Sequence, residues 1–215
     1  MRYALCSRMN IHMTELTHTE HRDYLGAKMG MWLFLFTEVL LFGGMFLLYA
    51  VYRETHTAAF HAAAKGLSTV IGAANTVILL TSSLTMALSI AAIRRGKRNH
   101  SILLQAATIV LALAFLVNKY FEWTEHIHHG LYPGGPELLA REHGEILFYG
   151  LYYVMTGIHG LHVLIGAGMI AFMLALTSRG TISSNDFIKL ENTGLFWHLV
   201  DVIWIYLFPL FYLIA

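Results

Sequence analysis

Ionisable residues occur inside stretches of this sequence that are otherwise apolar. Residues 195–204 read Leu-Phe-Trp-His-Leu-Val-Asp-Val-Ile-Trp and place His198 and Asp201 one helical turn apart. An ionisable side chain near the middle of a bilayer costs roughly 2.5–3.5 kcal/mol on insertion scales, so such residues normally have partners and often mark a function. Both side chains are therefore expected to face protein rather than lipid.

Glu38 is a second ionisable residue in an apolar stretch. It follows Lys28 by about 15 Å of helix rise, which is close to the middle of a membrane. A carboxyl group at this depth is expected to be protonated or hydrogen-bonded to another part of the protein. A structural hydrogen bond and a proton-handling role are both open.

Two histidines, His159 and His162, lie three residues apart in a third apolar stretch, on the face that also carries Thr156 and Gly166. Together with the carboxylates and His198 they have the residue types of a metal site inside a helical bundle. Core histidines held by hydrogen bonds explain the same pattern more simply. We therefore predict no metal site and no haem ligand, and we treat these residues as a membrane-embedded polar cluster of structural or proton-related role: Glu38, His159, His162, His198 and Asp201.

Lys119 and Glu122 lie one turn apart where another apolar stretch ends, so they are predicted to form an ion pair. The next residues, 125–129, read Glu-His-Ile-His-His. They could bind a metal ion if they met Glu142 or His143, but a solvated loop is the better interpretation, because closely spaced histidines without a scaffold do not fix a coordination geometry.

The composition is typical of a membrane protein. Hydrophobic residues make up 57% of the 215 residues and charged residues 13%, whereas soluble domains have about 25% charged residues. Five stretches are long and apolar enough to cross a bilayer, so the predicted fold is all-α, an integral membrane bundle of five transmembrane helices. We expect a polar N-terminal tail over residues 1–26 and a transmembrane domain over residues 27–215, with spans at about 27–51, 68–93, 101–121, 146–178 and 191–214.

Polar residues in the second span support this arrangement. Asn75, Ser82 and Ser89 recur every seven residues, a spacing that suits close helix packing with hydrogen bonds between helices.

The single cysteine, Cys6, excludes an intramolecular disulfide and a thiolate metal cluster.

Basic residues predict the orientation of the spans. Ten of the 14 Lys and Arg residues precede span one or lie in the connections between spans two and three and between spans four and five. Because cytoplasmic loops are enriched in Lys and Arg, the N-terminus is expected inside and the C-terminus outside. Residues 1–28 lack the apolar region of a cleaved signal peptide, so the first span is expected to direct insertion.

Several motifs, taken in order, resemble cytochrome c oxidase subunit III. The mitochondrial form of this family has seven spans, and this chain is similar to the five-span bacterial form found in cytochrome and quinol oxidase complexes. The resemblance extends from Lys28 to the C-terminus and is carried by the segments Lys28–Phe34, Thr37–Val39, Asn75–Thr76, Thr81–Ser83, Phe121–Trp123, Thr156–Val163 and Phe196–Asp201.

The resemblance implies an accessory role without a redox centre in this chain. Haem and copper would belong to the catalytic subunit I, beside which members of the family sit, with subunit II as a further partner. No catalytic residues are expected here, and no nucleic acid partner; membrane lipids, including a bound phospholipid, fit the family. Glu38 aligns with the family's membrane-embedded glutamate, and the location would be a prokaryotic inner (plasma) membrane. By resemblance, a polar interior ties the last two spans to the rest: His159, His162, His198 and Asp201.

The function implied by the resemblance is non-redox support of a haem-copper terminal oxidase, in which the whole complex reduces oxygen to water and translocates protons. This chain would stabilise the catalytic subunit and support proton uptake. Three alternatives stay open: a subunit III-like component of a quinol oxidase or a nitric oxide reductase complex, a stand-alone proton-coupled transporter that uses Glu38, His198 and Asp201, and a membrane metalloenzyme.

Overall fold

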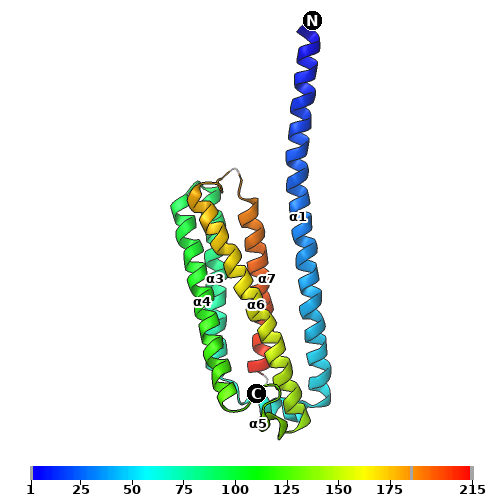
Figure 1. Cartoon of the computed structure of the whole chain (residues 1–215), viewed down its shortest axis with the longest axis vertical. Helices are drawn as coiled ribbons and strands as arrows, with labels where there is room; N and C mark the ends of the chain where they lie inside the picture. Colours follow the sequence, from blue (N-terminus) through cyan, green and yellow to red (C-terminus); the bar gives the residue numbers. More distant parts are fainter. Residues whose placement is uncertain (1, 185, 214–215) are drawn as a thin grey trace. The chain divides into compact units, whose positions relative to one another are not determined.

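The computed structural model describes residues 2–184 and 186–213, with side chains from residue 25 onward. All regular secondary structure in this part of the chain is helical (Figure 1). Residues up to Leu40 and residues from Leu41 onward form two compact units, and each is described by itself. The helices are α1 (Arg2–Thr55), α2 (Thr57–Ala64), α3 (Thr69–Arg94), α4 (Arg98–His128), α5 (Pro136–Leu139), α6 (His143–Arg179) and α7 (Ile188–Tyr212).

Five helices are long and apolar enough to cross a membrane, as the sequence predicts. They are the part of α1 from Leu25 to Thr55 and the whole of α3, α4, α6 and α7. The backbone of residues 2–26, the predicted polar tail, belongs to α1, and Met1 lies outside the described residues. The chain is therefore an all-helical, multi-pass membrane protein.

Four of these helices form a bundle in the second unit. Helix α3 packs against α4 and α7, and α6 packs against the same two helices, so each helix has two neighbours in the bundle (Figure 1). The short helices α2 and α5 pack on α6. Residues 41–55 of α1 also belong to this unit: the Tyr49 hydroxyl donates a hydrogen bond to the carbonyl oxygen of Leu210 in α7.

The spacing of buried residues explains how α3 and α4 pack. Buried positions on α4 follow one another at alternating steps of four and three residues, the heptad pattern of helices that wind around each other with a left-handed supercoil. These positions are Ser101, Gln105, Thr108, Ala112, Phe115, Lys119, Glu122 and His126. The stripe Asn75, Ser82 and Ser89 lies buried on α3, as expected for a packing face.

Glycines allow α7 to approach its neighbours closely. A methyl group added at Gly166 on α6 would lie 2.8 Å from the Trp197 ring, and one at Gly194 on α7 would lie 2.6 Å from Ile90. Because lipid gives little hydrophobic drive for helix association, membrane helices gain stability from such close packing at small residues.

The two connections at one end of the bundle are joined by Arg98. Helix α6 ends at Gly180, whose φ of 82° is the left-handed conformation that glycine adopts readily. The Arg98 guanidinium donates to the Thr177 carbonyl oxygen at 2.8 Å and to that of Ser178. A cation thus binds the carbonyl end of α6, which carries partial negative charge.

Candidate functional site: a buried polar network

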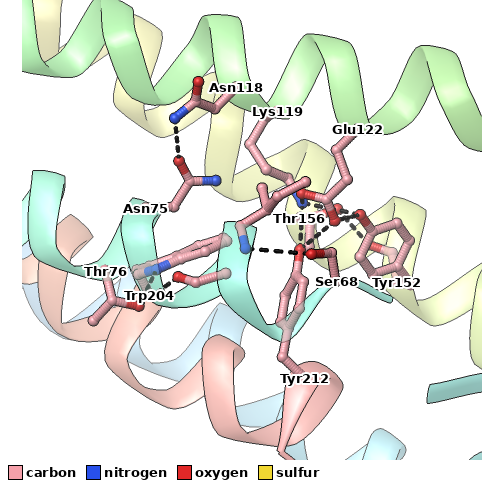
Figure 2. A network of polar contacts seen from close by, with 12 residues as sticks. Ser68, Asn75, Thr76, Asn118, Lys119, Glu122, Tyr152, Thr156, Trp204 and Tyr212 are labelled. Atoms are coloured by element: carbon pink, nitrogen blue, oxygen red, sulfur yellow. Dashed lines mark hydrogen bonds and ion pairs between the residues drawn. The ribbon is translucent and has the colours of Figure 1, made fainter. Parts of the chain in front are cut away.

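The densest polar cluster in the bundle surrounds Lys119 and Glu122 on α4. The Lys119 Nζ atom lies 3.3 Å from Glu122 Oε2, across one turn of the same helix. Relative exposure is 7% for Lys119 and 3% for Glu122, so the pair is almost entirely removed from solvent. The helix-end pair expected from the sequence is therefore part of the interior of the bundle (Figure 2).

Two tyrosines from other helices complete this network. Tyr152 on α6 and Tyr212 on α7 each donate a hydrogen bond of 2.5 Å to Glu122 Oε1. The same hydroxyl oxygens accept hydrogen bonds from Lys119 Nζ at 3.0 and 2.9 Å. Four side chains from three helices thus donate hydrogen bonds to one another or accept them, with both tyrosines pointing toward the carboxylate (Figure 2). Hydrogen bonds to charged groups are about twice as strong as neutral ones.

Aromatic rings surround the lysine of this network. Lys119 Nζ lies 4.8 Å from the centre of the Tyr152 ring, 5.6 Å from that of Tyr212 and 5.5 Å from that of Trp204. The faces of these rings carry partial negative charge and stabilise a buried cation. The network compensates its charges internally and holds the ends of α4, α6 and α7 together.

Two further hydrogen bonds join helices next to this network. Asn118 donates to the Asn75 side-chain oxygen at 3.0 Å, which links α4 to α3, and Trp204 donates to the Thr76 hydroxyl at 3.0 Å, which links α7 to α3 (Figure 2). Together with the network of Lys119, these bonds link every helix of the four-helix bundle to a neighbour through polar side chains.

His198 and Asp201, the pair in the last span, lie against α3. His198 Nδ1 is 2.6 Å from the Ser83 hydroxyl, whereas neither carboxyl oxygen of Asp201 has a hydrogen-bond partner among the described residues. Asp201 is only 2% exposed, whereas His198 is half-buried. His198 therefore connects α7 with α3 through a hydrogen bond that is separate from those of Lys119.

His159 and His162 on α6 have different surroundings. His159 is completely buried between the rings of Phe115 and Trp204, with ring centres 5.6 and 5.2 Å away, and neither of its nitrogens has a hydrogen-bond partner among the described residues. His162 is partly buried, and its Nδ1 atom lies 2.8 Å from the carbonyl oxygen of Ile158. His159 thus packs as an aromatic residue in the core.

Four residues of the predicted polar cluster, His159, His162, His198 and Asp201, lie on α6 and α7 of the bundle. Glu38 lies on α1 in the first unit, and its place beside the histidines stays a prediction. Within the described residues, no group of three or more His, Cys, Asp or Glu side chains is placed to hold a metal ion.

The prediction of a solvated loop at residues 125–129 was wrong. Helix α4 continues to His128, and His126 is buried at 7% exposure, with its ring 6.1 Å from those of Tyr149 and Tyr152. The physical reason is the heptad spacing of α4, which continues beyond Glu122 and directs His126 into the bundle.

Tyr152 and Tyr212 were not predicted as members of the site. Tyrosine is common near membrane interfaces, so its presence alone carries little information. The available signal was the lysine: a cation buried in an apolar span needs hydrogen-bond acceptors in addition to one carboxylate.

Five apolar helices joined by buried polar contacts define a multi-pass helical membrane protein. A sequence model of cytochrome c oxidase subunit III matches residues 9–215. The chain belongs to the cytochrome c oxidase subunit III family.

Relatives of this chain come from several kinds of oxidase. It is 32% identical over 213 residues to cytochrome c oxidase subunit 3 of Synechocystis sp., which covers 98% of this chain and 86% of that protein. It is 31% identical over 187 residues to cytochrome bo(3) ubiquinol oxidase subunit 3 of Pseudomonas aeruginosa, covering 86% and 84%. It is also 29% identical over 216 residues to heme-copper oxidase subunit I+III of Aeropyrum pernix, covering 95% of this chain and only 25% of that longer protein.

Proposed function

We propose that this chain is the accessory subunit III of a haem-copper terminal oxidase. The observation that carries the proposal is the family match over residues 9–215, which includes all five apolar helices. The chain stabilises the catalytic subunit and supports proton uptake, while oxygen reduction takes place at the haem and copper of that partner. No catalytic residue is assigned to this chain.

Subunit I is the first partner in this proposal. In the Aeropyrum pernix relative, a single protein is named subunit I+III, which supports direct association of the corresponding parts. Subunit II is a second expected partner. Membrane phospholipids surround the exposed apolar side chains of the helices.

The electron donor is cytochrome c or a quinol. Relatives named for each donor have nearly the same identity to this chain, 32% and 31%, so neither donor is favoured. A subunit III-like component of a quinol oxidase is therefore the second candidate.

We further propose that the N-terminus lies inside a prokaryotic plasma membrane and the C-terminus outside. The basic residues Arg95 and Lys97 in one connection, and Arg179 and Lys189 on either side of the other, support this orientation. Arg98 and the Arg94–Glu191 ion pair, 2.7 Å long, join these connections at one end of the bundle. Enrichment of Lys and Arg is typical of the cytoplasmic side.

Within the proposed subunit, the polar residues have two kinds of role. Lys119, Glu122 and His198 hold the helices of the bundle in register through their contacts with Tyr152, Tyr212 and Ser83. Asp201 is a buried part of the interior of α7. Glu38 is the residue assigned to proton-related support, and His159 and His162 contribute to the packed interior.

The test is purification of this chain through an affinity tag in a mild detergent. A reduced-minus-oxidised optical spectrum then detects haem, and mass spectrometry identifies every protein that travels with the chain. Haem bands together with a large polytopic catalytic subunit are the expected result, and the haem and partner types identify the donor.

A chain that stays alone and free of haem in several mild detergents would contradict the proposal. Proton transport by this isolated chain in liposomes would then favour the stand-alone transporter.

A further inference from the structure

Two histidines lie together where α1 ends beside the start of α6. His56 is the residue between α1 and α2, and His143 is the first residue of α6. The centres of the two rings are 6.0 Å apart, and their planes meet at 61°. His143 is exposed and His56 is half-buried, so solvent reaches both side chains. Neither residue belongs to the network of Lys119 or to the predicted polar cluster.

The backbone on both sides of His56 is fixed by hydrogen bonds. Its amide donates to the carbonyl oxygen of Tyr52 at 3.0 Å, and its carbonyl oxygen accepts from the amide of Phe60 at 3.0 Å. Gly144 permits close approach to α6, because a methyl group added there would lie 2.9 Å from His56 Cβ. The packing of this junction against the first turn of α6 therefore brings the two imidazoles together.

The hydrogen bonds of His56 determine which ring nitrogen keeps a lone pair. Its Nδ1 atom lies 2.8 Å from the Thr55 hydroxyl and 3.3 Å from the Tyr52 carbonyl oxygen. A carbonyl oxygen only accepts, so Nδ1 carries the hydrogen and Nε2 has the lone pair. Metal-binding histidines usually have this arrangement, in which one nitrogen donates to a nearby oxygen and the other binds the ion.

The separation of the rings fits one metal ion between them. A Zn–N bond is about 2.0–2.1 Å long and a ring nitrogen lies about 1.1 Å from the ring centre, so two imidazoles on one tetrahedral ion have centres about 5.2 Å apart. The observed distance of 6.0 Å exceeds this value by about 0.8 Å. Rotation of the exposed His143 side chain closes a difference of this size.

We propose that His56 and His143 bind one divalent transition-metal ion of the Zn²⁺ type. Imidazole nitrogen suits Zn²⁺, Cu²⁺ and Ni²⁺, whereas Ca²⁺ and Mg²⁺ prefer oxygen ligands. Water completes the coordination, since no third His, Cys, Asp or Glu side chain joins this pair in the part of the chain that the structure describes. The ion links the end of α1 to the start of α6, and the proposal does not depend on which oxidase the chain serves.

The experiment uses the full chain with the subunits that accompany it. The protein is purified through an affinity tag without histidine and freed of loosely bound metal by a chelator. Zinc chloride is then titrated against a chromophoric competitor, with excess Ca²⁺ and Mg²⁺ present. We expect the wild type to bind one more zinc ion than His143→Gln.

His143→Gln is the main variant, because this exposed side chain lies outside the packed core. His61→Gln is the matched control: it removes an exposed histidine from the neighbouring helix α2 and should leave zinc binding unchanged. Thr55→Ala keeps both ligands but removes one acceptor of His56 Nδ1. It should weaken zinc binding about tenfold, since loss of a group that orients a metal ligand costs about 10–100-fold in affinity.

Stability provides a second measurement. Zinc should raise the SDS concentration at which the wild type unfolds, because an ion that binds only the folded protein stabilises it, and His143→Gln should remove this effect. Unchanged zinc binding in His143→Gln would overturn the proposal. An equal loss of binding in His61→Gln would overturn it as well, since it would mean general attraction of zinc by surface histidines.

Discussion

Glu122 is the common acceptor of the buried network, and replacing it with glutamine tests whether this network stabilises the bundle. The carboxylate accepts hydrogen bonds from Tyr152 and Tyr212 and pairs with Lys119. Glu122→Gln keeps the size of the side chain and one oxygen acceptor. Its main effect is to leave the Lys119 ammonium without a counter-charge in the protein interior.

The structure sets the expected magnitude. Removing one partner of a buried ion pair costs about 3–5 kcal/mol. Lys119 retains two tyrosine hydroxyls and the faces of their rings, which partly compensate its charge. Hydrogen bonds between membrane helices contribute only about 0.6 kcal/mol on average, so loss of one tyrosine bond adds little. We therefore expect Glu122→Gln to lower the free energy of unfolding by about 3 kcal/mol.

The assay is reversible unfolding of the purified protein in mixed detergent and SDS micelles, followed by circular dichroism. Lys119→Met and the double variant Lys119→Met/Glu122→Gln complete a mutant cycle. Removing both charges should cost less than the sum of the single losses, by about 2 kcal/mol, because neither charge is then left unpaired.

Arg141 and Glu145 provide the control pair. Their ion pair is shorter, at 2.7 Å, but the side chains are 44% and 16% exposed. Exposed pairs contribute at most about 1 kcal/mol, so Glu145→Gln should have little effect. The argument from burial would be refuted if Glu122→Gln cost no more than Glu145→Gln, or if the losses in the cycle were additive.

Three other predictions concern single helices. Gly166→Ala should destabilise the protein by about 1–3 kcal/mol, since the added methyl group meets Trp197. Gly168→Ala on the same helix has open space around it and should be neutral or slightly stabilising. Unfolding in SDS measures both variants. His159→Leu should preserve or raise the unfolding free energy, because the buried imidazole has no hydrogen-bond partner among the described residues, and a loss above about 2 kcal/mol would show that it has one. Glu38→Gln should leave the proposed oxidase assembled, with only a modest change in oxygen consumption; failure of the subunits to co-purify would show a structural role instead.

The five helices could be predicted because a membrane span is a local property of the sequence. About 20 consecutive apolar residues suffice, and no knowledge of neighbouring helices is needed. The proximity of Lys119 and Glu122 could also be predicted from neighbouring residues alone, since helix geometry places residues three apart on one face.

The rest of the network could not be predicted, because its members are far apart in the chain. Tyr152 and Tyr212 lie 33 and 93 positions after Lys119, and helix periodicity says nothing about which helices pack together. His126 is an intermediate case. Its burial follows from the heptad spacing of α4, but the sequence alone led us to consider these histidines only as a metal site or a solvated loop.

The order of the network along the chain has a consequence for membrane insertion. Ribosomes add about 5–20 residues per second, so Tyr212 is synthesised about 5–20 s after Lys119, 93 residues earlier. During this delay α4 must enter the bilayer without its last hydrogen-bond partner. Glu122, only three residues away on the same helix, can neutralise the lysine as soon as that turn forms. The ion pair within α4 therefore allows this span to be inserted in the order of translation. Insertion does not have to wait for the helices that later surround α4 in the bundle.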